Sequence, residues 1–137
     1  MLKLKQVRDG APKPFTAYEK AAGYDFYNIH GRLEISPGQT IVIPSGWAAE
    51  IPEGWVGIFH ARSSYFKKGL VVDGVIDSDY RGELGIMATN ASPHLIEIGA
   101  GERFAQLVIQ PHLSGFEIVT ELTATERGEK SYGSTSK

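Results

Sequence analysis

The sequence of 137 residues contains no cysteine. This absence excludes thiol catalysis, cysteine zinc sites and a disulfide framework, and it agrees with a reducing compartment. The N-terminal stretch MLKLKQVRDG lacks the apolar core of a signal peptide, and no apolar run approaches the length of a membrane span. We therefore expect a soluble, cytoplasmic protein that has no membrane partner.

An excess of basic residues is also missing, since 14 Lys and Arg stand against 16 Asp and Glu. Binding to a nucleic-acid backbone needs a basic face, so we expect no nucleic-acid partner. A small anionic ligand remains compatible with this charge, because a few Arg side chains and backbone N–H groups can build a phosphate site. The histidines show no metal-ligand spacing and are interpreted as structural: His30, His60, His94 and His112.

Long helical periodicity is absent as well, and short apolar segments alternate with turns rich in Gly or Pro. This pattern predicts an all-β sandwich or barrel with one short helical turn at 63–68. The length predicts a single β domain over 1–125, and the polar, Gly- and Ser-rich remainder 126–137 is expected to be flexible. The predicted strands are 2–7, 32–35, 40–43, 47–51, 55–59, 70–76, 83–88, 95–98, 104–109 and 116–119.

The segment 74–83 places polar residues directly after an apolar strand. Asp77, Asp79 and Tyr80 follow Val75 and Ile76, and glycines bound the segment. A carboxylate at a strand end can orient and deprotonate a water molecule. The alternative is a polar hairpin tip, where Asp and Ser are common for conformational reasons.

A second polar group, Arg62-Ser63-Ser64, also follows an apolar strand. Arg, two hydroxyls and the first N–H groups of a helical turn could bind an anion. The same residues could simply start a helix, because Ser is a common N-cap.

Three further positions are ambiguous when each is taken alone. Asp25 lies in an apolar stretch and needs either a charged partner or a turn backbone. Gln106 interrupts an apolar strand, and its amide must bind either a ligand or a neighbouring strand. In the tail 127–136, Arg127 could pair with a phosphate and Tyr132 could stack on a base, or the tail could be a disordered terminus.

The order of these segments resembles the five motifs of the trimeric dUTPase family, over residues 22–136. The resemblance implies a distorted jelly-roll or β-barrel-like fold that assembles as a homotrimer. It also implies active sites shared by three subunits: motifs one, two and four from one subunit, the third from a second and the fifth from a third. The matching segments are 22–25, 62–64, 74–82, 103–107, and 127–128 with 132–135, of which the third is the most specific.

The same resemblance implies hydrolysis of dUTP to dUMP and pyrophosphate with Mg²⁺, by attack of water on the α-phosphate. This reaction limits uracil incorporation into DNA and supplies dUMP for dTMP synthesis. By this resemblance Asp77 activates the water, Tyr80 packs under the deoxyribose and excludes a ribose, and Asp25 contacts the metal indirectly through water. The metal is expected to be held mainly by phosphates and waters, as Mg²⁺ often is.

The resemblance further assigns the substrate contacts. A hairpin around 71–74 would recognise the pyrimidine through backbone groups. Lys130 and Ser131 stand where the family usually has two glycines, and Tyr132 stands where Phe is usual. We expect these departures to affect how the tail closes over the active site. The substrate-binding residues are Arg62, Ser63, Ser64 and Gln106 at the phosphates, Gly74, Val75, Ile76 and Tyr80 at the nucleoside, Arg127 at the γ-phosphate, and Tyr132, Gly133 and Ser134 over the base.

Two other functions are compatible with parts of the pattern. Deoxycytidine triphosphate deaminases share this fold and have similar Arg-Ser-Ser and Ile-Asp segments, but they need a Glu near the cytosine C4. Glu83 is not placed like that Glu, and the Asp79-Tyr80 pair favours a dUTPase. A non-catalytic regulator that binds a nucleotide or a protein is the other alternative, and the intact Asp77 and Arg127 argue against it.

Overall fold

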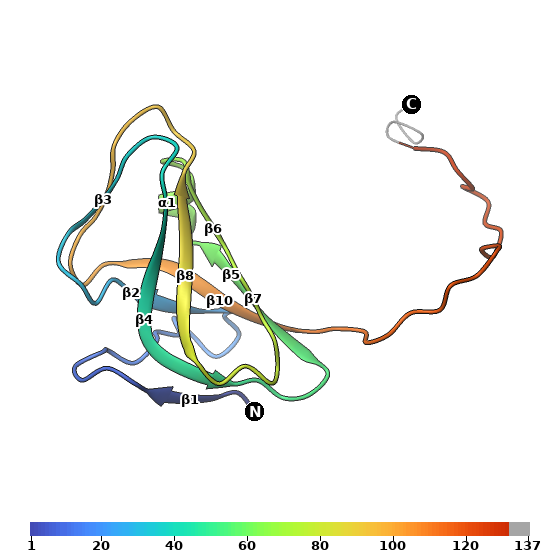
Figure 1. The fold of residues 1–137 in the computed structure, drawn as a ribbon, viewed down its shortest axis with the longest axis horizontal. Helices are drawn as coiled ribbons and strands as arrows, with labels where there is room; N and C mark the ends of the chain where they lie inside the picture. Colours follow the sequence, from blue (N-terminus) through green and yellow to red (C-terminus); the bar gives the residue numbers. More distant parts are fainter. Residues whose placement is uncertain (132–137) are drawn as a thin grey trace.

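The computed structural model describes residues 1–131, and its regular secondary structure is almost entirely antiparallel strands around one core (Figure 1). One sheet has the order β1-β4-β8-β6, a second has the order β2-β10-β5-β7, and β3 pairs with β9. The strands are β1 (Lys3–Gln6), β2 (Gly23–Tyr27), β3 (Leu33–Ile35), β4 (Thr40–Glu50), β5 (Trp55–Ala61), β6 (Leu70–Asp73), β7 (Val75–Ile76), β8 (Glu83–Asn90), β9 (Ile96–Ile98) and β10 (Arg103–Pro111). Among the described residues α1 (Ser63–Phe66) is the one helix, and none there is long and apolar enough to cross a membrane.

Alternation along the strands produces the core, because successive side chains point to opposite faces of a sheet. In β8, Leu84 and Ile86 are buried, whereas Met87, which points to the opposite face of the sheet, is exposed. The rings of Phe26 on β2 and Phe59 on β5 meet edge to face, with centroids 5.3 Å apart. Both rings share one buried cluster with Leu84 and Ile86 of the other large sheet, so the core joins the two sheets. Burying one such apolar side chain contributes roughly 1.5–3 kcal/mol, and the arrangement confirms the predicted all-β class.

The predicted break at residues 44–46 is wrong, because β4 runs through it as one strand. The pairing of β4 with β8 shifts register between Pro44 and Ala48, as in a β-bulge. Gly46 adopts a φ of 82°, which a residue with a Cβ rarely adopts. Turn-forming residues here bend a strand without ending it.

The predicted strand 70–76 is divided at Gly74 between two sheets. Before Gly74, β6 pairs with β8, and after it, β7 pairs with β5. The Gly74 carbonyl accepts a hydrogen bond from the Phe59 amide at 3.0 Å, so the chain passes from one sheet to the other without reversing. Residues 71–74 therefore do not form a hairpin by themselves, which corrects the expectation for this segment.

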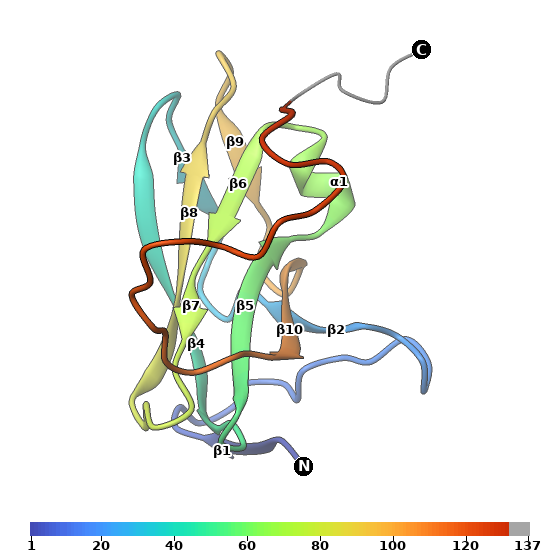
Figure 2. The ribbon, with the colours of Figure 1, turned by 90° about the vertical axis from the view of Figure 1, so that its right-hand side faces the viewer.

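Beyond β10 the chain leaves the body of the protein (Figures 1 and 2). The amide of His112 donates to the Gly54 carbonyl at 3.0 Å, and residues 112–131 are all exposed. The strand predicted at 116–119 is not present, because no neighbouring strand in the same chain pairs with it. We call residues 113–131 the C-terminal segment.

Candidate active site

One surface pocket of about 450 Å³ gathers residues from three of the five predicted motifs. It lies where β2, β10 and the start of α1 meet, and we call it the Asp25 pocket. The predicted residues from segments distant in sequence thus come together in one place. Its lining residues are Asp25, Arg62, Ser63, Ser64, Lys67 and Gln106.

Asp25 holds two arginines in this pocket. Its Oδ2 atom lies 3.1 Å from Nε of Arg62 and 3.1 Å from Nη1 of Arg103. The guanidinium of Arg103 also lies over the ring of Phe15, 4.1 Å from its centroid. The Asp25 side chain is only 17% exposed, so these partners meet the need of a largely buried carboxylate for charge compensation.

Arg62 is fixed by the backbone as well as by Asp25. Its amide donates to the Phe104 carbonyl at 3.0 Å, and Nη1 donates to the Arg103 carbonyl at 3.1 Å. Arg62 itself occupies the N-cap of α1, and no side chain caps this helix. The N-cap interpretation of the serines is therefore wrong, and the exposed hydroxyls of Ser63 and Ser64 are left at the pocket surface.

Gln106 lies on β10 between two polar neighbours, opposite Asp25 on β2 and His60 on β5. Its Nε2 atom donates a long hydrogen bond of 3.4 Å to the Ala61 carbonyl. A Cβ at Gly23 would lie 2.5 Å from Gln106 Oε1, so a larger residue there would displace the amide from its present position. Gln106 thus both connects two strands and lines the pocket.

A second pocket of about 410 Å³ contains the residues of the third predicted motif. The Tyr80 amide donates to the Asp77 carbonyl at 3.2 Å, which closes a turn after β7. The Tyr80 hydroxyl donates to the Glu83 carbonyl at 3.0 Å, and the Asp77 carboxylate is exposed. This Asp77 pocket is lined by Val42, Val75, Ile76, Asp77, Tyr80, Glu83, Gly85 and Met87.

The two pockets have no lining residue in common. Asp77 follows β7, whose Ile76 pairs with Gly57 on β5, whereas Gln106 pairs with His60 near the other end of β5. A single chain therefore carries two separate parts of the predicted site. Buried Gly74 precedes the second part.

Arg127, the predicted tail residue within the described part of the chain, lines neither pocket. Nε of Arg127 donates to the Lys130 carbonyl at 2.9 Å, a bond within the C-terminal segment. Tyr132, Gly133 and Ser134 lie outside the described residues. The structure thus brings together the first, second and fourth motifs and leaves the third apart from them.

Two cations of the Asp25 pocket were not assigned from the sequence. Regular alternation of side chains along a strand does not predict the direction of the Arg103 side chain, because the register of β10 against β2 shifts between Arg103 and Ala105. In the sequence Lys67 looks like one of two ordinary surface lysines. The feature that could have identified it is its separation of four residues from Ser63, which places both side chains on the same face of a helix.

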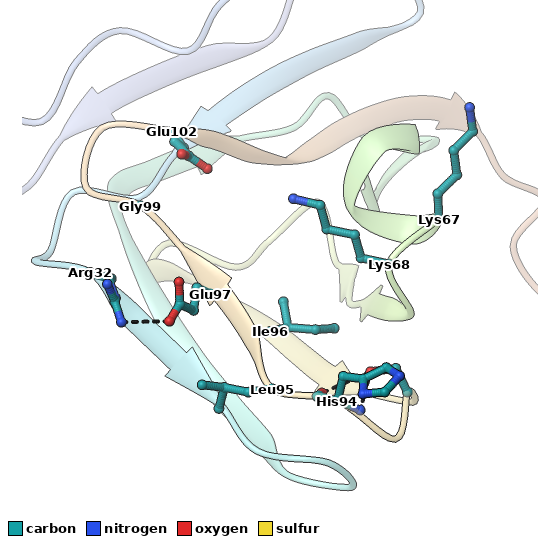
Figure 3. A pocket seen from close by; sticks show the side chains of 10 residues that line it. Arg32, Lys67, Lys68, His94, Leu95, Ile96, Glu97, Gly99 and Glu102 are labelled. Carbon is teal, nitrogen blue, oxygen red and sulfur yellow. Dashed lines mark hydrogen bonds and ion pairs between the residues drawn. The ribbon is translucent and has the colours of Figure 1, made fainter.

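A further cavity of about 860 Å³ holds no predicted site residue (Figure 3). Glu102 lines this cavity, and its carboxylate accepts a hydrogen bond from the hydroxyl of the buried Tyr65. Burial and this bond raise the pKa of Tyr65 well above its ordinary value, and the same bond lowers the pKa of Glu102. The bond connects α1 to the loop before β10, next to the Asp25 pocket.

The chain is similar to known proteins along nearly its whole length. A profile of the dUTPase family matches residues 9–136. The deoxyuridine 5'-triphosphate nucleotidohydrolase of Escherichia phage T5 is 40% identical, over 98% of this chain and 97% of that protein. The chain belongs to the dUTPase family. A nucleotidohydrolase with the same name from Nautilia profundicola is also 40% identical, over 99% of both chains.

Solved structures of dUTPases have the same fold. The dUTPase of Staphylococcus bacteriophage 80alpha with dUPNHPP superposes with a TM-score of 0.86 at 32% identity, over 98% of both chains. A mutant dUTPase of phage phi11 of S. aureus, described for its coordination of a structural Mg(II) ion, gives 0.77 at 27% identity, over 88% of this chain and 97% of that one. These comparisons confirm the predicted family, the jelly-roll-like fold and the assignment of the chain as an enzyme.

Proposed function

We propose that the protein hydrolyses dUTP to dUMP and pyrophosphate, using the Asp25 pocket for the phosphates and Asp77 for the attacking water. The observation that carries this proposal is the Asp25 pocket itself. Three segments far apart in sequence meet there around two arginines and two free hydroxyls. In the cell this reaction would limit uracil incorporation into DNA and supply dUMP for dTMP synthesis.

The chemistry follows from the groups that each pocket offers. The hydroxyls of Ser63 and Ser64 and the amide of Gln106 can donate hydrogen bonds to phosphate oxygens. The Asp77 carboxylate accepts a proton from water, whose oxygen forms a bond to the α-phosphorus while the bond to the pyrophosphate oxygen breaks. Positioning and electrostatic stabilisation supply most of the acceleration in such phosphoryl transfers.

Tyr80 and the residues before it form the proposed nucleoside site. The Tyr80 ring is fixed at its hydroxyl by the Glu83 carbonyl, so it can pack under a deoxyribose and leave no room for a 2′-hydroxyl. Backbone groups of Gly74, Val75 and Ile76 would then contact the nucleoside and read uracil.

The separation of the two pockets supports a site built by several copies of the chain. The Asp77 pocket of a second subunit would face the Asp25 pocket of the first, because one chain does not bring them together. The C-terminal segment exposes apolar side chains that a third subunit would cover, and such exposure is typical of protein contacts. These side chains are Leu113, Phe116, Ile118, Val119 and Leu122.

The proposed lid comprises residues 126–137, which begin within the C-terminal segment. Arg127 would reach the γ-phosphate, and Tyr132 would stack on uracil with Gly133 and Ser134 beside it. Among residues 1–131, the exposed guanidinium of Arg127 has the Lys130 carbonyl as its partner, and a phosphate can replace that contact.

The residues of the Asp25 pocket fit the Mg²⁺ that the family implies. Residues 1–131 contain no cluster of three or more His, Cys, Asp or Glu that could hold a metal. Mg²⁺ commonly binds through substrate phosphates and waters with one or two carboxylates. Asp25 binds its arginines through Oδ2, so its other oxygen can accept a hydrogen bond from a metal-bound water. When bound, the ion would neutralise charge on the phosphates.

The environment of Glu83 argues against the deaminase alternative. Its carboxylate binds Arg8 at 2.6 and 3.1 Å and accepts a hydrogen bond from the Gly46 amide at 2.9 Å. The bond from Arg8 lowers the pKa of Glu83. A carboxylate held ionised in this way stabilises the N-terminal segment and is poorly suited to donate a proton to a substrate.

Product analysis tests the proposal directly. The protein is incubated with Mg²⁺ and dUTP, dCTP, dTTP or UTP in parallel, and the products are separated by ion-exchange chromatography. We expect dUMP and pyrophosphate from dUTP and little turnover of the other three nucleotides. Formation of dUTP from dCTP would establish the deaminase instead, and nucleotide binding without any product would establish the non-catalytic alternative.

A further inference from the structure

Lys67 is the one cation lining the Asp25 pocket that has no ion pair within residues 1–131. The guanidinium groups of Arg62 and Arg103 are both paired with Asp25. Lys67 lines the pocket with Arg62 and has no ion pair among the described residues. The pocket therefore presents an exposed ammonium group beside two hydroxyls and an amide.

The local backbone places Lys67 on the side of α1 that carries Ser63. The Lys67 amide donates to the Ser63 carbonyl at 3.0 Å, so the two residues are one helical turn apart. Lys68 projects elsewhere, and its Nζ lies 4.9 Å from the centroid of the Tyr65 ring. Figure 3 shows the two lysine side chains pointing in different directions, with the end of Lys67 turned away from the middle of the larger cavity.

We infer that Lys67 is a further phosphate-binding residue of this enzyme. A triphosphate carries several negative charges, and the Asp25 carboxylate offsets one of the two arginine charges beside it. The ammonium of a lysine is a compact charge with three donors on a flexible stem, which suits contact with a phosphate chain. This inference rests on the proposed function, because that function places the phosphates of dUTP in this pocket.

The position of Lys67 at the rim of the pocket determines the kinetic effect we expect. An exposed ammonium contacts bound substrate and the transition state about equally, so it should lower KM and leave kcat nearly unchanged. Its contribution should weaken as salt rises, because ions screen exposed charges.

Steady-state kinetics with dUTP and Mg²⁺ test this inference on the full-length protein. Lys67→Met, which keeps the stem and removes the charge, should raise KM about fivefold, on the scale of an exposed ion pair, with kcat within about twofold of the wild-type value. Lys67→Arg should restore most of the affinity, and Lys68→Met is the matched control that should leave both constants unchanged. Equal KM values for Lys67→Met and Lys68→Met would overturn the inference.

A binding measurement separates failure of this inference from failure of the proposed function. Titration with inorganic pyrophosphate in a calorimeter reports on the phosphate site without any turnover. We expect a weaker Kd for Lys67→Met than for wild type, and the difference should shrink at high salt. If the wild type hydrolyses no dUTP, the proposed function fails, yet the pyrophosphate titration still decides the role of Lys67. Identical Kd values for the two proteins would exclude Lys67 from the phosphate site.

Discussion

In the Asp25 pocket the functional side chains are held by their own chain, whereas the C-terminal segment contacts almost nothing. Asp25 binds Arg62 and Arg103, and the backbone of β10 binds Arg62 a second time. Between 113 and 131 the hydrogen bonds of the described chain run within the segment itself. The phosphate half of the proposed site is thus organised in the free chain, and the other elements need a partner or a ligand.

The physical basis of this difference is the cost of ordering a chain. Fixing one residue costs roughly 1–2 kcal/mol of backbone entropy. The Asp25 pocket offsets that cost because it lies on strands whose inner faces are buried in the core. The C-terminal segment buries no apolar surface of its own, so order there must come from a second copy of the chain or from nucleotide. The proposed enzyme therefore combines a preformed binding site with a covering element that assembles later.

The largest expected effect comes from Asp77→Asn, which separates chemistry from binding. Because the Asp25 pocket is organised without Asp77, the variant should bind nucleotide normally. Its turnover should fall by about a hundredfold or more, the scale of a lost general base. We would measure kcat for dUTP and the Kd of a non-hydrolysable dUTP analogue. Asp9→Asn, at an exposed turn, is the control, and near-normal turnover of Asp77→Asn would refute the mechanism.

Deleting residues 127–137 tests the role of the proposed lid. The strands and core end before this segment, so light scattering should still show a folded trimer. Activity should drop by about thirtyfold or more, because base stacking and a phosphate contact are both lost. An active monomer would contradict the shared site.

Hydrogen exchange of the intact protein adds a second measurement of the segment. Amides from 127 onward should be unprotected alone and protected with the dUTP analogue. If they exchange equally in both states, or if the truncated enzyme is fully active, these residues are only a terminus.

Tyr80→Ala should produce a smaller effect that is confined to sugar selectivity. Removing the ring leaves space for a 2′-hydroxyl, so the ratio of kcat/KM for dUTP over UTP should narrow by about tenfold. Tyr80→Phe keeps the ring and loses only the bond to the Glu83 carbonyl, and it should retain most of the selectivity. An unchanged ratio in Tyr80→Ala would assign the selection of the sugar to another residue.

Much of the fold could be predicted from the sequence because local alternation and tertiary burial agree. The predicted strand 104–109 lies inside β10, and the helical turn at 63–68 contains α1. Pairing between strands was not predictable, since alternation says nothing about partners. For this reason the apolar run 70–76 was predicted as one strand, whereas the structure divides it at Gly74 between two sheets.

The site was predictable to the extent that each motif is contiguous in sequence. Asp25, Arg62 and Gln106 were selected one by one, and the structure brings them together. The double pairing of Asp25 was not foreseen, because a bulge in β10 turns Arg103 toward it. The environments of Asp25 and Glu83 depend on contacts between residues more than 30 positions apart, which no local pattern contains.

The smallest expected effect concerns the support of the Asp25 pocket, where Tyr65 on α1 is bonded to Glu102. Tyr65→Phe removes one hydrogen bond from a buried side chain and should lower Tm by about 2–4 °C at neutral pH. Tyr18→Phe is the matched control, because Tyr18 is 66% exposed. Its Tm should equal that of the wild type.

The pKa shifts of Glu102 and Tyr65 predict how the Tm difference between wild type and Tyr65→Phe changes with pH. The bond from Tyr65 lowers the pKa of Glu102 below its ordinary value of 4.5, so the stability it provides is present above pH 4.5 and is lost as pH falls through the lowered pKa. The pKa of Tyr65 is raised above its ordinary value of 10, so its contribution is fully present below pH 10. The Tm difference between wild type and Tyr65→Phe should therefore be constant from about pH 5 to 9 and should shrink toward pH 3. Thermal unfolding across that range measures it, and a gap that stays constant down to pH 3 would mean that the Glu102 carboxylate does not stabilise α1 through Tyr65.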